Sequence, residues 1–174
     1  MKKFLAILLV VAFAAGFAAC ANNAVDKPDA DVKGEGVMTH AEYVAAELDS
    51  QVVIETYVQA KQSWWEDKAT VYTQDKDGAY FLYNMACSEE DYAKLEKGTK
   101  IKVTGYKAEW SGEVEIIDAT FEIEEGSFVA EALDVTSMLG TDELIKHQNE
   151  FVSFKGMTVA AVSYTHLTLP TILR

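Results

Sequence analysis

The chain has 174 residues, with 28 acidic and 15 basic side chains and a formal net charge of −13 at pH 7. Leaving out the expected signal peptide and tail, described below, removes Lys2, Lys3 and Arg174 but no acid, so 12 basic residues face 28 acids and the net charge becomes −16. No arginine then remains. This composition disfavours nucleic acid as a partner, because phosphate binding depends on Lys and Arg.

Residues 1–20 have the pattern of a bacterial lipoprotein signal peptide. A positive start, Met1–Lys3, precedes the apolar run Phe4–Ala19, which is shorter than the ~20 residues of a membrane-spanning helix. Small residues directly before Cys20 resemble a lipobox, so we expect a lipid on Cys20 and a mature protein tethered outside the cytoplasm to the bacterial cell membrane. The alternative is an ordinary signal peptide in which this cysteine stands by chance.

Residues 21–38 contain Asn, Asp, Lys, Gly and one Pro and little that packs, which predicts a flexible tether. Thr39 and Glu42, three residues apart, predict a capping box. It would open a short helix that runs through Leu48.

The next stretch, residues 52–124, predicts three strands, a helix and two more strands. Asp77-Gly78 between strands two and three favours a tight hairpin with a positive φ. Ser88 followed by acids predicts the start of the helix, and Gly98 its end. The strands show alternating apolar side chains and are expected at residues 52–60, 69–73, 79–85, 100–106 and 114–123.

The order β-β-β-α-β-β within about 75 residues is typical of the five-stranded Greek-key barrel called the OB-fold. We therefore predict an all-β domain at residues 39–126, with the one helix between strands three and four plugging an end of the barrel. Gly105 is expected where strand four bends or bulges to close it.

Three segments of this domain, Lys61–Trp65, Asp75–Gly78 and Ile101–Tyr106, resemble the OB-fold lipoproteins of gut bacteria, whose barrel is similar to tRNA-anticodon-binding domains. The resemblance spans residues 39–126. It implies the fold and a location on the cell envelope, and no particular activity, since OB-folds carry many functions.

Residues 127–161 predict the start of a second, truncated OB-like repeat. Thr141-Asp142-Glu143 predicts another capped helix before a strand at Phe151, and Val152 follows Val52 by 100 residues. In this chain that strand would lack partners. Residues 162–174 look like the in-frame translation of a transposon-type sequencing adapter, so we give them no functional weight.

The tryptophans lie in two loops that flank the same face of an OB-fold: Trp64 and Trp65 follow strand one, and Trp110 lies between strands four and five. We predict that they form a stacking platform, extended by those tyrosines of the first three strands that point outward. Aromatic faces suit sugar rings as well as bases, and sugars need no positive charge. The alternative is that one or more tryptophans belong to the core. The candidate tyrosines are Tyr57, Tyr72, Tyr80 and Tyr83.

No catalytic residue, metal or cofactor is expected. The segment Asp75–Gly78 is like the opening of a calcium-binding loop, but the third acidic ligand and the distal glutamate are missing, so a plain hairpin turn is favoured. Cys87 is expected to be a buried packing residue, because a thiol nucleophile needs a His base and His40 and His147 lie outside the barrel. Glu113 and Glu115 share a strand face but have no nucleophile opposite.

We therefore expect a membrane-anchored, non-enzymatic binding module for a glycan, a peptide or an envelope protein. One alternative is an OB-fold module for single-stranded nucleic acid. The other is an accessory part of an enzyme whose catalytic region lies elsewhere.

Overall fold

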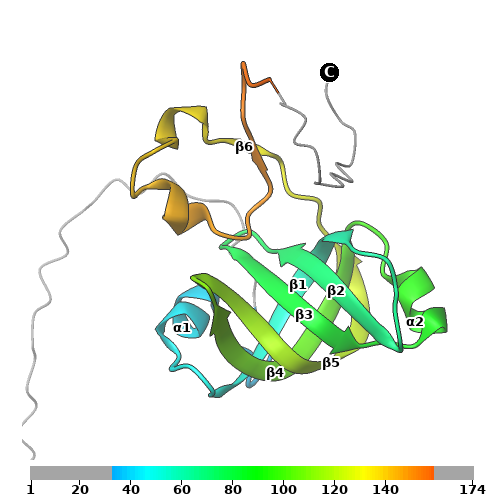
Figure 1. Ribbon diagram of the computed structural model, residues 1–174. Helices are drawn as coiled ribbons and strands as arrows, with labels where there is room; N and C mark the ends of the chain where they lie inside the picture. The colour runs from blue at the N-terminus through cyan, green and yellow to red at the C-terminus, as the bar shows by residue number, and fades with distance from the viewer. Residues whose placement is uncertain (1–32, 159–174) are drawn as a thin grey trace, which may run out of the picture.

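The computed structural model describes residues 33–158. Its main body is a barrel of five strands with one short helix at each end (Figure 1). The expected signal peptide, Cys20 and the adapter-like tail lie outside the described residues. The strands are β1 (Gln51–Lys61), β2 (Lys68–Gln74), β3 (Ala79–Ala86), β4 (Thr99–Trp110) and β5 (Glu113–Ser127), and the helices are α1 (His40–Ala45) and α2 (Glu89–Lys94).

The strands follow one another around the barrel in the order β1-β2-β3-β5-β4, and β4 pairs again with β1. All neighbours are antiparallel except β3 and β5, which run parallel where Leu82 pairs with Ile116. With α2 between β3 and β4, this is the OB-fold that the sequence predicts.

Two irregularities let the strands curve into a closed barrel. The first half of β1 pairs with β4 and the second half pairs with β2. The register of the β1–β2 pairing shifts between Val58 and Ala60 of β1. The β4–β5 register shifts between Thr104 and Tyr106. A Cβ on the intervening Gly105 would lie 2.6 Å from Ile116 Cγ2, so only glycine permits this close approach.

The β2–β3 hairpin is antiparallel as predicted, but its turn works differently. Gly78 does not adopt a positive φ; instead, Asp75 Oδ1 accepts the backbone N–H groups of Asp77 and Gly78, each at 2.8 Å. This side-chain turn replaces the left-handed backbone that we expected. Glycine is still required at position 78, because a Cβ there would overlap the ring of His40.

Helix α1 has the predicted capping box, in which Thr39 and Glu42 exchange hydrogen bonds. The helix ends at Ala45, earlier than the predicted Leu48. Its last carbonyl groups accept hydrogen bonds from Lys107, whose Nζ lies 2.8 to 3.1 Å from three of their oxygens. This lysine is buried, and its positive charge stabilises the negative end of the helix dipole.

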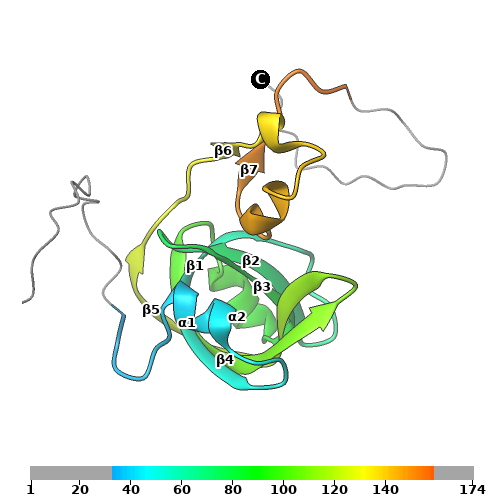
Figure 2. The same ribbon diagram turned by 90° about the vertical axis from the view of Figure 1, so that its left-hand side faces the viewer.

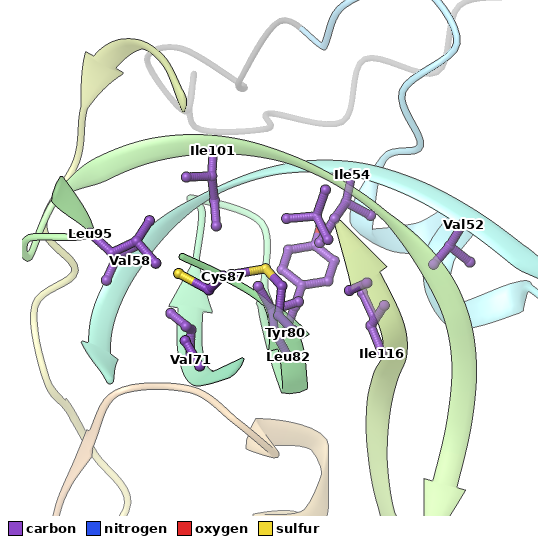
Figure 3. Packing of buried hydrophobic residues seen from close by; sticks show 14 of the residues in the cluster. Val52, Ile54, Val58, Val71, Tyr80, Leu82, Cys87, Leu95, Ile101 and Ile116 are labelled. Carbon is purple, nitrogen blue, oxygen red and sulfur yellow. The ribbon is translucent and has the colours of Figure 1, made fainter. Parts of the chain in front are cut away.

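The barrel interior holds the core of the protein (Figure 3). All five strands contribute inward side chains, and Tyr43 of α1 and Leu95, which directly follows α2, pack against them from opposite ends. The largest fully buried side chains of the barrel are Tyr80, Ile54, Leu82, Met85, Leu95, Ile101 and Ile116.

The end of the predicted tether is bound to the barrel. Lys33 Nζ pairs with the fully buried carboxylate of Asp75 at 2.8 Å and donates to the backbone oxygen of Glu55 at 2.9 Å. Met38 then donates its N–H to Val53 on β1. These contacts fix residues 33–38 on the barrel, although their composition predicts a flexible segment. The tether prediction is therefore wrong for these residues.

Residues 128–158 lie outside the barrel (Figure 2). They contain two single-turn 3-10 helices, η1 (Thr136–Met138) and η2 (Leu144–His147), and a parallel pair of two-residue strands, β6 (Leu133–Asp134) and β7 (Val152–Ser153). The predicted capped α-helix is therefore wrong, since η2 has no side-chain cap. The strand at Val152 has a partner in β6. That these residues open a second barrel stays a prediction.

Candidate ligand-binding face

The structure does not bring the three tryptophans together. Trp64 lies at the end covered by α2, because its indole Nε1 donates to the Cys87 carbonyl at 2.9 Å. Trp65 pairs with Lys68 at the same end. Trp110 ends β4 just beyond Lys107, which contacts α1 at the opposite end. The prediction that the three tryptophans form a single platform is therefore wrong. Strand order predicts which loops flank the face, but the β1–β2 loop lies at one end of the barrel and the β4–β5 loop lies at the other.

The neighbouring tryptophans Trp64 and Trp65 differ in their surroundings. Trp64 is half-buried, and its hydrogen bond to Cys87 ties the β1–β2 loop to the end of β3. Trp65 is 71% exposed. An exposed indole of this size costs hydrophobic free energy in water, so Trp65 is the better candidate for contact with a ligand.

Three aromatic rings form a strip on the outer face of β2 and β3. Tyr72 stacks on Phe81 with ring centroids 4.9 Å apart, and Phe81 lies 6.2 Å from Tyr83. Phe81 is buried between its neighbours, whereas Tyr83 is 46% exposed. Phe81 was not among the predicted site residues, although the period of two along β3 places it on the same face as Tyr83.

The same period excludes Tyr80 from this strip. Tyr80 lies three residues before Tyr83 and points into the core, where it is fully buried. Its hydroxyl donates to Asp75 Oδ2 at 3.0 Å. Burial and the negative charge of Asp75 raise the pKa of Tyr80, so the hydroxyl stays protonated as a donor. Our prediction that Tyr80 binds ligand is wrong. Tyr57 packs edge-on against Phe128.

Polar contacts fix the strip from the side of the β1–β2 loop. The Gln62 amide donates to the Tyr72 hydroxyl at 3.0 Å, and the Tyr92 hydroxyl donates to the Gln62 carbonyl at 2.8 Å. Lys61 Nζ lies 3.8 Å from the centre of the Tyr92 ring, a cation–π contact. We call Trp65, Tyr72, Phe81 and Tyr83 the β2–β3 face.

The charge around this face is negative. The exposed acids Glu66 and Asp67 follow Trp65 in the same loop. Glu89 and Glu90, both exposed, begin helix α2 after β3. Lys61 and Lys68 flank the same loop, and Lys94 pairs with Glu90, so acids exceed lysines only slightly on this rim. Together with the net charge of the chain, −13, this excess disfavours phosphate.

The other candidate reactive groups have structural surroundings. Cys87 is buried in the core as predicted, and burial together with Asp91 raises the pKa of its thiol, which reduces its nucleophilicity. Burial and the charge of Glu113 raise the pKa of Glu115. Within residues 33–158, no group of three or more His, Cys, Asp or Glu side chains is placed to hold a metal ion. The carboxylate of Asp75 accepts the N–H groups of its own turn and pairs with Lys33.

None of the helices between residues 33 and 158 is long and apolar enough to cross a membrane.

No protein-family model matches this chain, and no curated protein sequence matches it. Among solved structures, the chain is similar to one in the crystal structure of the S. pombe Stn1-ten1 complex, with a TM-score of 0.35 and 20% sequence identity. The alignment covers 43% of this chain and 58% of the matched chain.

Proposed function

We propose that this protein is a non-enzymatic binding module that holds ligands with flat rings on the β2–β3 face. The observation that carries the proposal is the exposure of Tyr83 beside the ordered pair Tyr72–Phe81, together with the exposed Trp65 in the loop that leads into β2. The OB-fold binds oligonucleotides and oligosaccharides on this side of the barrel. Ordered rings lose little conformational entropy when a ligand stacks on them.

A neutral glycan is the ligand that the charge favours. The chain carries a net charge of −13, and the rim of the face adds exposed acids on both sides. A sugar ring stacks on an aromatic side chain through its C–H face and needs no counter-charge. Such binding is expected to be insensitive to salt.

Single-stranded nucleic acid is the second candidate, and one observation favours it. The aromatic strip lies on the outer surface of β2 and β3, where OB-folds stack successive bases. Titrating the protein with a deoxythymidine oligonucleotide and with neutral oligosaccharides at several salt concentrations separates the candidates. Affinity for the oligonucleotide that falls steeply with salt would overturn the glycan assignment.

The adjacent tryptophans provide a matched pair of variants. Trp65→Ala should weaken ligand binding by about 1–3 kcal/mol, as the loss of a stacking ring does, and should leave thermal stability unchanged. Trp64→Phe removes the hydrogen bond to Cys87 and part of a half-buried ring, so it should lower stability and keep affinity. If Trp65→Ala binds ligand as tightly as the parent protein, the β2–β3 face is not the site.

We also propose that the module acts outside the cytoplasm, anchored through a lipid on Cys20. The support is the sequence of the first 20 residues alone. Labelled palmitate should appear on the protein in bacteria, and Cys20→Ser should abolish the label and release the protein from membranes. A label that persists in Cys20→Ser would disprove this anchor.

A further inference from the structure

A second pair of exposed aromatic side chains lies on the outer face of β4. Tyr106 is 43% exposed and Trp110 is 76% exposed. They are four residues apart on one strand, so both point to the same face, about 13 Å from each other. Trp110, which does not join the other tryptophans, therefore belongs to a different surface.

A groove of about 530 Å³ continues this surface along β4, toward the end covered by α2. Its floor spans three adjacent strands, with Val53 on β1, Lys102 and Thr104 on β4 and Thr120 and Glu122 on β5, and Gly36 of the segment before α1 borders it. The volume lies within the ~300–1,000 Å³ of small-ligand sites. We call Tyr106, Trp110 and the groove the β4–β5 face.

The register of β4 and β5 sets the chemistry of the groove. Thr104 lies directly opposite Thr120, so two hydroxyl groups that donate and accept hydrogen bonds lie side by side. Lys102 lies opposite Glu122, so the charges of this pair balance. Hydroxyls, a balanced charge pair and exposed rings in one line suit a neutral, hydroxyl-rich chain.

The exposed rings of the two aromatic faces lie on different strands. The rings of the first face lie on β2 and β3 and in the loop before β2, and those of the second lie on β4, which is hydrogen-bonded to β1 and β5. The two faces adjoin where β5 pairs with β3, but a ligand stacked on one set of rings leaves the other set free.

We propose that the β4–β5 face is a second binding site, which takes a neutral oligosaccharide. Sugar rings stack on Tyr106 and Trp110, and the hydroxyl groups of the sugar bond to Thr104 and Thr120. The choice of ligand class rests on the proposed function, but the site itself does not. With two separate faces, one molecule holds two oligosaccharide chains at once and cross-links them.

Backbone NMR of the full chain tests this proposal with neutral hexasaccharides of glucose, mannose and N-acetylglucosamine as probes. At least one probe should shift amides of β4 between Lys102 and Trp110 and of β5 near Thr120, and calorimetry should give two ligands per chain. Tyr106→Ala should weaken binding at this face about tenfold, an effect in the range of a lost stacking ring. Thr120→Arg should block the groove.

The matched control is Tyr83→Ala, which removes an exposed ring of similar accessibility from the other face. It should change only the shifts on β3. Shifts confined to β2 and β3 would overturn the second site and leave the proposed function standing. Shifts confined to β4 and β5 would do the reverse, and no shift with any probe would overturn both for glycans.

Discussion

The barrel and the C-terminal segment, residues 128–158, place similar side chains in opposite surroundings. Among residues 33–158, eleven of the twelve largest fully buried side chains belong to the barrel strands or, in the case of Leu95, directly follow α2, and one, Val135, belongs to the segment. The segment instead exposes large apolar side chains over most of its length. These are Val129, Leu133, Leu139, Ile145, Phe151, Phe154 and Met157.

Closure of the sheet, and not composition, therefore makes the core. Each barrel strand has two hydrogen-bonded neighbours, so its inward side chains are covered from every direction. The β6–β7 pair has two residues in each strand and covers nothing on its own. Paired substitutions, one in each region, test this comparison.

The largest difference should come from truncating a leucine in each region. Leu82→Ala should destabilise the protein by about 4 kcal/mol, because Leu82 is fully buried at the β3–β5 seam and leaves a cavity. Leu139→Ala should cost less than about 0.5 kcal/mol, because Leu139 is 41% exposed. Urea unfolding measures both, and equal losses would contradict the contrast between the regions.

The second largest difference in stability is expected between two ion pairs of equal length. Lys33–Asp75 and Lys155–Asp134 are both 2.8 Å long, but only the first is buried. Lys33→Met should cost about 3 kcal/mol, since it leaves the Asp75 carboxylate buried without its cation. Lys155→Met should leave the unfolding midpoint unchanged within error. A midpoint for Lys33→Met equal to that of the parent protein would show that residues 33–38 are not bound to the barrel in solution.

A smaller, pH-dependent effect is expected at Lys100, which bridges Glu55 and Glu124 on the barrel wall at 2.9 Å each. Burial alone would lower the pKa of Lys100, but the hydrogen bonds to both carboxylates outweigh it and raise the pKa. The stabilisation is therefore complete below the unfolded pKa of about 10.4 and decreases as pH rises above it.

Lys100→Met should accordingly cost about 1–2 kcal/mol at pH 7, a value reduced because the ammonium is partly exposed. The cost should shrink when unfolding is repeated at about pH 11. A cost that stays constant between the two pH values would mean that the methylene chain, and not the charge, carries the effect.

The smallest difference in stability is expected between Thr39 and Thr141, both of which were predicted from the sequence to cap a helix. Thr39→Ala should cost about 1 kcal/mol, because it removes the capping box of α1. Thr141 caps no α-helix; its hydroxyl donates to the Met138 carbonyl in an exposed turn. Thr141→Ala should therefore change stability by less than about 0.5 kcal/mol, and a cost equal to that of Thr39→Ala would revive the predicted second helix.

The sequence predicts the local features of the barrel well, because they arise from neighbours in the chain. Strand alternation, the caps at Thr39 and Ser88 and the glycine at position 105 all appear as expected. Contacts between distant residues are not visible in this way. The Lys33–Asp75 pair spans 42 residues, and nothing near either residue indicates the other.

The candidate site was only partly predictable for the same reason. The alternation along β3 was sufficient to separate Tyr80 from Tyr83 and to include Phe81. The position of Trp110 depends instead on how β4 and β5 align with β3, which is a property of the closed barrel. Sequence spacing alone does not contain it.

The parallel contact between β3 and β5 also constrains how the protein is made. β5 is the last barrel strand in the chain, so a chain that emerges N-terminus first on the far side of the membrane, as the proposed export requires, can form hairpins and α2 early but cannot seal the barrel until Ser127 has emerged. Until then the inner faces of four strands stay open to water. A chaperone that binds apolar segments of unfolded chains therefore has its target until that residue has crossed.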